Sequence, residues 1–565
     1  MAAPPYRMTC TTTCMRVSTG TARCGSSKPM GRPLRARRPT MTKSIRTALA
    51  AAVLTALAGI SQAQAADIIP VITDPAGVGY NDTTPATPVG GNPGTTKGEQ
   101  RRYVAAYAAA LWGSVLQSDV PIFVQARFLS LAPGVLGSAG ATFVNRDFAN
   151  APVAGTWYHT ALADSIAGTD LVPGQFDIQS QFSTNFTFYY GLDGNTPAGE
   201  VNFLDVVMHE YAHGLGFSNF ENEASGAFLS GIQDIYSVFT YDNTAQKYWT
   251  AMTQAERATS GVNFGNVVFT GPRATAGAAL LLDDRQDFRV LTPAAIAGNY
   301  AYGTASFGPA LTTSNFNGEV VLSQDAADPA GPSTTDGCSP LSNVAQVAGK
   351  IALIDRGTCG FTIKVKNAQN AGAIGVIIAD NAPGNPPAGL GGADPTITIP
   401  SIRVTQAAGA SFKANLPMTV SFVIDPTKLQ GADDLGRPRL FMPNPVQSGS
   451  SGSHYDSIAL PNLLMEPAIN GTLRGYYNLD ITPHLLADIG WRLNTGNAQI
   501  GSPSVPDCDT GIKVVNDGGL IGGATIQASN EVCLLSAQTR NQYYNCMDAN
   551  RDRMVASGVL TATQG

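Results

Sequence analysis

The 565-residue sequence predicts an α+β fold that is interrupted by a smaller α/β unit. Strand-like and helix-like periodicities alternate over the first 300 or so residues. A β-α-β pattern with glycines between its elements occupies residues 349–380. Charged residues make up only 13% of the chain, which has 60 Gly and 36 Pro and is therefore typical of a globular protein with many turns. The length predicts about two to four domains.

The N-terminal segment predicts export. Residues 41–65 combine a basic start, an apolar run over 47–60 and a small-x-small site ending at Ala65. These are the features of a secretory signal, and the run is too short to remain in a bilayer. We expect cleavage after Ala65 and a periplasmic or extracellular location. Residues 1–40 lack periodicity and are either a gene start extended upstream of Met41 or a genuine basic leader.

The charge balance argues against a nucleic-acid partner. Ten of the 35 Lys and Arg, and none of the 41 Asp and Glu, lie in residues 1–65. The chain after residue 65 therefore carries 25 basic and 41 acidic residues, a net charge of −16. This excess repels phosphate backbones, so we expect no nucleic-acid partner. No other apolar run is long enough for a membrane span.

The sequence before residue 306 predicts a mixture of helices and strands. We expect helices over 99–116 and 252–260, and strands over 120–127, 186–191, 267–271 and 279–282. The second unit starts near Gly318. It is expected to hold strands over 349–357, 375–380 and 399–404, with helices over 361–371 and 405–415.

The segment 201–217 predicts a buried helix with a metal site. Its apolar residues form a stripe, and Asn202 stands where a helix-start cap is expected. His209 and His213 are four residues apart and therefore share one face of the helix. Glu210 follows the first histidine, which completes the H-E-x-x-H arrangement of zinc peptidases. The alternative is a core helix with two satisfied histidines, but buried His and Glu side chains rarely occur together without a partner.

A third zinc ligand has to come from elsewhere. Gly216 lies where H-E-x-x-H-x-x-G-x-x-H enzymes turn the chain, but their next ligand position holds Asn219, a poor zinc ligand. Glu221 and Glu223 are rival ligands, as would suit a thermolysin-like site. They lie too close to His213 to stand on a separate second helix. The remaining histidines are His159, His454 and His484, and we expect the last of these to be a packed helix residue.

Four strings near the end of the chain resemble the catalytic domain of leishmanolysin, a metzincin. They are Gly-Ser-His-Tyr-Asp at 452–456, Leu-Leu-Met-Glu-Pro at 463–467, Gly-Tyr-Tyr at 475–477 and Asp-Ile-Gly-Trp at 488–491. The resemblance implies an α+β metzincin-like catalytic domain with a mixed sheet, split into 66–305 and 426–492. It makes His454 the third ligand and Met465 the residue of a Met-turn beneath the zinc. Tyr476 or Tyr477 either contacts the oxyanion or packs on the S1′ wall.

The interrupting unit, 306–425, resembles the protease-associated (PA) domain. Three segments carry the resemblance, namely Gly-Lys-Ile-Ala-Leu-Ile-Asp-Arg-Gly-x-Cys-x-Phe from 349, Ala-Gly-Ala-x-Gly-Val-Ile-Ile from 371 and Ile-Pro-Ser-Ile from 399. The resemblance implies that this unit binds or screens substrate, and the alternative is a structural spacer. It also places Cys338 and Cys359 where that domain commonly has a disulfide.

Residues 493–565 are expected to form a linker and a small C-terminal extension, either an attachment module or a segment removed on maturation. They contain Cys508, Cys533 and Cys546, and this odd count predicts that one thiol stays unpaired or forms an intermolecular disulfide. Calcium near Asp433–Asp434 or Asp480 is conceivable, but the spacing is not diagnostic.

The sequence thus predicts a secreted zinc metalloendopeptidase that acts on proteins or peptides with Glu210 as general base. The competing hypothesis is a non-catalytic binding protein that keeps the fold and uses the interrupting unit for recognition. The sequence leaves the oligomeric state open.

Overall fold

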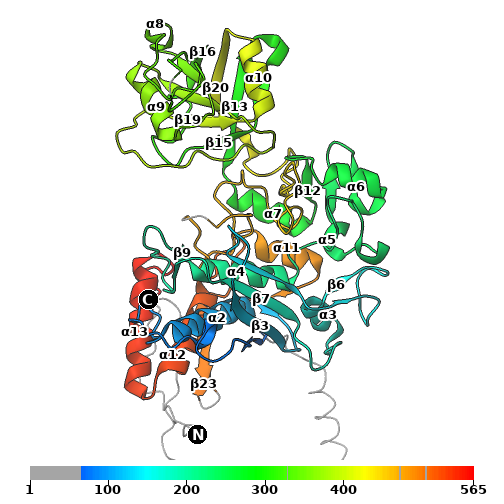
Figure 1. Cartoon of the computed structure of the whole chain (residues 1–565). Coiled ribbons are helices and arrows are strands. Elements are labelled where there is room, and N and C mark those ends of the chain that lie inside the picture. Colours follow the sequence, from blue (N-terminus) through cyan, green and yellow to red (C-terminus); the bar gives the residue numbers. More distant parts are fainter. Residues whose placement is uncertain (1–64, 328, 470–471, 503–504) are drawn as a thin grey trace, which may run out of the picture.

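The computed structural model describes residues 65–565 except 328, 470–471 and 503–504. The predicted leader and signal segment, apart from Ala65, lie outside the described residues. Figure 1 shows a lower body, which contains the C-terminus, and an upper unit that is joined to it by a narrow connection. None of the described helices is long and apolar enough to cross a lipid bilayer.

The lower body is built on a four-stranded sheet. Its strands are β1 (Ile68–Ile72), β3 (Ile122–Leu129), β7 (Ile178–Ser183) and β4 (Gly137–Ala141), in the order β1-β3-β7-β4. The first three are parallel, and β4 is an antiparallel edge strand. Buried residues alternate along β3, as expected for a half-buried strand. The predicted strand over 120–127 is thereby confirmed with a shift of two residues.

Two helices pack on this sheet and on each other, α2 (Lys97–Val115) and α4 (Phe203–Leu215). A capping box between Thr96 and Glu99 starts α2. The indole Nε1 of Trp112 donates to the carbonyl of Met208 at 3.0 Å, which ties α2 to the middle of α4. The predicted helix over 99–116 therefore positions the helix that carries the metal motif.

The chain after α4 builds a second layer of the lower body. It comprises α5 (Ile235–Val238), β10 (Thr240–Asp242), β11 (Lys247–Tyr248), α6 (Gln254–Ser260), β12 (Val267–Phe269) and α7 (Pro272–Leu281). The predicted helix over 252–260 and strand over 267–271 are confirmed. The strand predicted over 279–282 is wrong, because this run ends α7. Pro272 begins that helix, and its alanine-rich body packs against α11 (Thr482–Ile489).

The upper unit contains an eight-stranded sheet in the order β14-β13-β20-β16-β17-β18-β19-β15. Its strands are β13 (Asp284–Thr292), β14 (Gly298–Tyr300), β15 (Tyr302–Thr304), β16 (Asn317–Leu322), β17 (Ile351–Asp355), β18 (Gly375–Ala379), β19 (Ser401–Val404) and β20 (Met418–Leu429). Strands β16 to β19 are mutually parallel. Helices α8 (Val344–Val347), α9 (Phe361–Asn370) and α10 (Gln406–Ala414) connect them. The predicted β-α-β pattern is confirmed.

The upper unit begins earlier than the sequence suggested. Asp284 at the start of β13 pairs with Leu429 at the end of β20, so the unit spans 284–429 and not 306–425. The backbone N–H of Gln430 donates to the carbonyl of Asp283 at 2.8 Å, which places the two ends of the unit side by side. Cys338 and Cys359 form a disulfide, the pairing that the resemblance to PA domains implied.

The C-terminal residues belong to the lower body and are not a separate extension. A hairpin of β22 (Asn497–Ser502) and β23 (Val505–Lys513) stands where a linker was expected. Helix α12 (Gly522–Ser536) packs along α2, and its Ala524, Ala528 and Val532 belong to the main hydrophobic core. Helix α13 (Arg540–Ala556) is joined to α12 by a disulfide between Cys533 and Cys546, and Cys508 is a free, exposed thiol.

Candidate metal centre

The metal motif lies on a helix with well-defined ends. The side chain of Asn202 accepts from the N–H groups of Leu204 and Asp205, at 3.0 and 3.4 Å, which caps the start of α4 as predicted. Gly216 ends the helix at a φ of 130°, a conformation that favours glycine. All residues of α4 are buried, so its polar side chains need partners.

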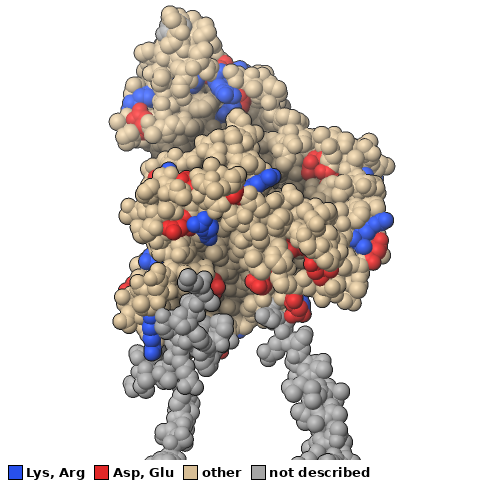
Figure 2. Space-filling model, turned by 60° about the horizontal axis from the view of Figure 1, so that its bottom comes forward, with Lys and Arg blue, Asp and Glu red and all other residues tan. Residues whose placement is uncertain are grey.

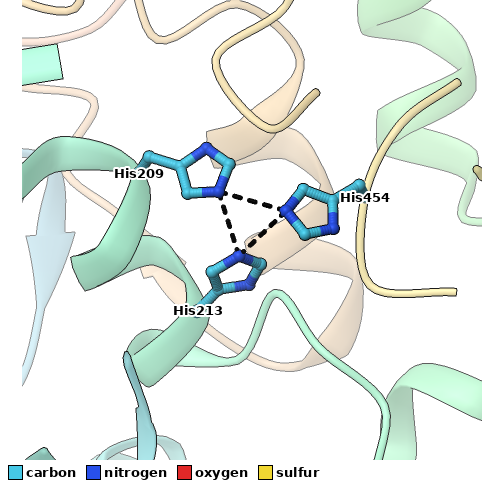
Figure 3. Close-up of side chains that lie close together, drawn as sticks. All are labelled: His209, His213 and His454. Atoms are coloured by element: carbon cyan, nitrogen blue, oxygen red, sulfur yellow. Dashed lines mark hydrogen bonds between the residues drawn. The ribbon is translucent and has the colours of Figure 1, made fainter. Parts of the chain in front are cut away.

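Three histidine rings converge at one point (Figure 3). The Nε2 atoms of His209 and His213 are 3.1 Å apart, and that of His454 lies 3.1 Å from the first and 3.3 Å from the second. All three residues are buried. Among the described residues, they are the one group of three or more His, Cys, Asp or Glu with ligand atoms close enough to hold a metal.

The other nitrogen of each ring faces a backbone carbonyl. The Nδ1 atoms of His209, His213 and His454 lie 2.7 Å from Leu464 O, 2.7 Å from Phe217 O and 2.8 Å from Ser450 O, respectively. A carbonyl only accepts, so each Nδ1 carries the ring proton and donates. Burial lowers the pKa of His209 to about 4 and that of His454 to about 3, so both rings are neutral at pH 7.

Three neutral rings with protonated Nδ1 atoms direct three Nε2 lone pairs at one another with no proton between them. Lone pairs at this separation repel unless a cation lies among them. A tetrahedral zinc with Zn–N distances of about 2.0–2.1 Å places its nitrogen ligands about 3.3 Å apart. The observed separations of 3.1–3.3 Å match that spacing. The triad could therefore hold a metal ion, and zinc suits its size and donor set.

Backbone pairing on both sides brings His454 to α4. The N–H of Phe441 donates to the carbonyl of His454 at 2.9 Å, and the N–H of Asp456 donates to that of Arg439 at 2.9 Å. On the other side, the N–H of Tyr455 donates to the carbonyl of Met465 at 2.8 Å. The histidine is thus held between segment 439–441 and the turn at residue 465.

That turn also supports the first histidine. Leu464 accepts from His209 through its carbonyl, and its N–H donates to the Asp480 carboxylate at 2.5 Å. Met465 is fully buried in the core beside it. The carboxylate is therefore a support of the metal centre that sequence reasoning missed, since nothing local links residue 480 to residue 209. The Met-turn role of Met465 stays a prediction.

The carboxylates considered for calcium already have other partners. Asp480 accepts from Leu464 and Thr482, Asp433 from Arg437 and Asn243, and Asp434 pairs with Lys428 and Arg285. No group of three ligands surrounds any of them among the described residues. The structure gives the suggestion of calcium no support.

Glu210 lies beside the triad and against the sheet edge. A Cβ atom placed on Gly137 of strand β4 would lie only 2.7 Å from Oε1 of Glu210. Burial raises the pKa of this carboxyl to about 8, while a hydrogen bond from the backbone of Ala139 opposes the shift. A cation bound to the neighbouring rings would also lower this pKa. The role of Glu210 as general base stays a prediction.

The two predicted tyrosines lie elsewhere. The ring of Tyr476 lines a small cavity of about 170 Å³ beneath α13, together with Tyr107 and Arg553 and with none of the three histidines. Tyr477 packs against Tyr476, with ring centroids 4.8 Å apart. Neither contact with an oxyanion nor packing on an S1′ wall follows from these contacts, so both roles stay predictions.

The remaining histidines and the rival acidic ligands are not part of the triad. His159 hydrogen-bonds Ser218 Oγ at 2.7 Å, and His484 on α11 lies 2.9 Å from Asp517 O, as expected of a packed helix residue. Glu221 is buried next to Asp234. Ser218 follows α4, so its hydrogen bond with His159 fixes the chain where it leaves the helix. Sequence reasoning missed this contact, because its partners are 59 residues apart.

Comparison with known proteins assigns one part of the chain. The PA domain family matches residues 316–412. Human ER degradation-enhancing alpha-mannosidase-like protein 3 is 55% identical over 51 residues, or 9% of this chain and 6% of that protein. Vacuolar-sorting receptor 2 of Arabidopsis thaliana is 32% identical over 146 residues, 23% and 22% of the two chains. A probable lipoprotein aminopeptidase of Mycobacterium tuberculosis is 31% identical over 130 residues, 22% and 24%.

The chain thus spans a quarter or less of the length of these curated relatives. Among solved structures, the zinc aminopeptidase BSAP of Bacillus subtilis is 19% identical over 27% of this chain and 36% of that one, with a TM-score of 0.19. An aminopeptidase of Aneurinibacillus sp. strain AM-1 is also 19% identical, over 34% and 42%, with a TM-score of 0.18. Likenesses this slight carry no argument about function. None of the proteins named here is described as a leishmanolysin, so that resemblance stays a prediction, whereas residues 316–412 are a PA domain within the upper unit.

Proposed function

We propose that this protein is a secreted zinc metalloendopeptidase in which His209, His213 and His454 hold the metal and Glu210 is the general base. One observation carries the proposal. Three Nε2 lone pairs converge within 3.3 Å beside a buried glutamate, and each ring is fixed by a backbone acceptor. This arrangement matches a catalytic zinc site with three protein ligands and one open position.

The chain's own residues supply binding and proton transfer. A zinc ion bound to the three rings would supply Lewis acidity toward a water molecule and a peptide carbonyl. The Glu210 carboxylate accepts a proton from the attacking water and then delivers it to the departing amine nitrogen. The Nδ1–H bonds to backbone carbonyls keep the imidazoles in the tautomer that presents Nε2 to the metal.

The sheet edge supports a polypeptide substrate. Among the described strands, β4 pairs with β7 alone, and its residues Gly137 and Ala139 contact Glu210. An extended peptide can add to such an edge through backbone hydrogen bonds. Glu210 contacts Gly137 at the start of β4 and accepts a backbone hydrogen bond from Ala139 in its middle, so a peptide that pairs along this strand would pass the general base, which favours an endopeptidase. Two disulfides, together with the predicted signal, support an oxidising compartment outside the cytoplasm.

The test is to replace Glu210→Gln in the full chain. Glutamine has the size of glutamate but cannot accept the proton, so casein hydrolysis should fall about 10²- to 10⁴-fold while metal content stays at one zinc per chain. Glu531→Gln, an exposed change on α12, is the matched control and should leave both values unchanged. Full hydrolysis by the zinc-loaded Glu210→Gln variant would refute the proposed role.

A non-catalytic binding protein is the second candidate. The match to a vacuolar-sorting receptor, a protein not described as a hydrolase, favours it. If the wild-type chain binds zinc but cleaves neither casein nor a mixed peptide library, this second function replaces the first.

A further inference from the structure

A groove of about 880 Å³ lies between the upper unit and the part of the lower body that carries His454. Its walls include Gln286, Asn299 and Ala388 from the upper unit and Arg439, Phe441 and Asn462 from the lower body. The two parts meet at the β13–β20 stem and at a backbone pair. In that pair, Asn385 donates to Asn444 O at 2.9 Å and Asn444 donates to Asn385 O at 2.7 Å.

One cation in this groove lacks a hydrogen-bonded partner. The guanidinium of Arg439 makes no hydrogen bond and no ion pair within 4.0 Å with any residue that the structure describes, and its Nε is buried without an acceptor. The carboxylate of Asp456 attracts it from a greater distance. The other charged residues of the groove are paired with each other, because Arg285 Nε lies 3.1 Å from Asp287 Oδ1. A half-buried guanidinium without an acceptor is costly, and a carboxylate from a ligand would remove that cost.

The unpaired guanidinium is also close to the metal centre along the backbone. Segment 439–441 runs beside 454–456 and is hydrogen-bonded to it at both ends, with Leu440 bridging to Tyr455. A ligand on Arg439 would therefore lie on the segment that holds His454 in place.

We propose that this groove binds an acidic segment of a polypeptide, with a carboxylate on Arg439. The volume lies in the upper part of the range of about 300–1,000 Å³ that is usual for ligand sites. Amide side chains at residues 286, 299, 385 and 462 can donate to and accept from a peptide backbone. Residues of edge strands β14 and β15 also line the groove. This site is distinct from that of Glu210, and the proposal does not depend on catalysis.

The test measures peptide binding to the full chain in the Glu210→Gln background, which keeps the probe intact. Fluorescence anisotropy compares a labelled octapeptide of alternating Gly and Glu with its Gly and Gln counterpart. We expect the acidic peptide to bind at least about tenfold more tightly and Arg439→Gln to remove that difference. Arg273→Gln removes one exposed cation outside the groove and should change nothing.

Equal binding of the two peptides, or an Arg439→Gln variant within twofold of the parent, would overturn the proposal. Tighter binding of an oligogalacturonate than of the acidic peptide would also overturn it, because the groove would then select a sugar. If Arg439→Gln does not fold, Ala388→Trp decides the question. This exposed residue lines the groove, and its enlargement should weaken acidic-peptide binding at least fivefold, whereas unchanged affinity would count against the groove.

Discussion

At the scale of single residues, the metal centre depends on backbone atoms as much as on histidines. Each ring donates Nδ1–H to a carbonyl; those of Phe217 and Ser450 lie four residues from their histidine, whereas that of Leu464 reaches His209 from the second half of the chain. A backbone acceptor cannot be removed by a side-chain substitution, so the tautomer of each ring is robust. The imidazoles themselves are the vulnerable positions.

The third ligand is tested by His454→Ala. Only two nitrogen ligands would remain, so we expect zinc content after dialysis to fall from one per chain to below about a tenth. His484→Ala is the matched control, because this histidine lies on α11 outside the triad, and it should retain its zinc. Metal analysis of both proteins decides the outcome. One tightly held zinc in His454→Ala would identify another residue as the third ligand.

At the scale of elements, the site depends on contacts between the ends of α4 and irregular segments from the second half of the chain. The turn at Leu464–Met465 contacts α4 through His209, contacts segment 454–456 through Tyr455 and is held by Asp480. These contacts are mainly backbone hydrogen bonds, which explains how a segment with little regular structure can position a ligand.

The support from Asp480 is testable by Asp480→Asn. The amide loses the charge-assisted bond to the Leu464 N–H, so the carbonyl that accepts from His209 should be held less firmly. We expect zinc affinity to fall about 10- to 100-fold in competition with a chelator. Asp517→Asn, an exposed change, should have the wild-type affinity. If both variants bind zinc equally well, the carboxylate has no role in positioning.

A buried carboxyl pair should make stability depend on pH. Asp164 of helix α3 (Thr160–Ala167) is almost fully buried beside Asp177, and burial raises its pKa to about 7, from an ordinary value of 3.8. The folded state therefore favours the protonated form, and the free energy of unfolding should fall as pH rises from about 4 through 7.

Asp164→Asn removes this penalty. Its gain in unfolding free energy over wild type should be larger at pH 8 than at pH 5.5 by about 1 kcal/mol, with the shift discounted for solvent screening. Urea denaturation at the two pH values measures it. Asp119→Asn, at an exposed position, should show no such difference. A gain that does not increase with pH would contradict the assignment.

At the scale of the whole molecule, the upper unit is inserted into a lower body that is continuous without it. The hydrogen bond between Gln430 and Asp283 brings the two ends of the insertion together. Figure 2 shows charged side chains scattered singly or in small groups over a largely uncharged surface, with no extended basic area in that view. Because the two ends of the insertion adjoin, we expect that the upper unit can be removed by mutagenesis without breaking the lower body.

Replacing residues 284–429 by a short Gly-Ser linker tests this architecture. The metal centre and its core lie in the lower body, so the shortened chain should fold and bind one zinc. It should lose the groove and with it acidic-peptide binding. Metal analysis and anisotropy measure both properties, with a linker inserted after Gly449 in the full chain as a control for loop changes. A shortened chain that folds without binding zinc would show that the upper unit is needed to hold His454.

Local features were the most predictable from sequence. The capped helix α4, the β-α-β pattern and the disulfide segment each depend on residues close together in the chain, and each was found within a few residues of its predicted position. The start of the upper unit at Asp284 was missed because its strand partner lies at Leu429. The sequence predicts a small extension with short strand-like runs after residue 506, whereas the structure has helices α12 and α13 there; the packing of α12 against α2 leaves no local signal.

The sequence by itself determined that two histidines and a glutamate lie together, because helix geometry sets their relative positions within one turn. Only the tertiary structure decided where His454 lies, which carbonyl orients His209 and that the Arg439 guanidinium has no hydrogen-bond acceptor. The two contacts of His209 join residues more than 200 positions apart, and they depend on the free energy of the whole packed chain, which no local periodicity records.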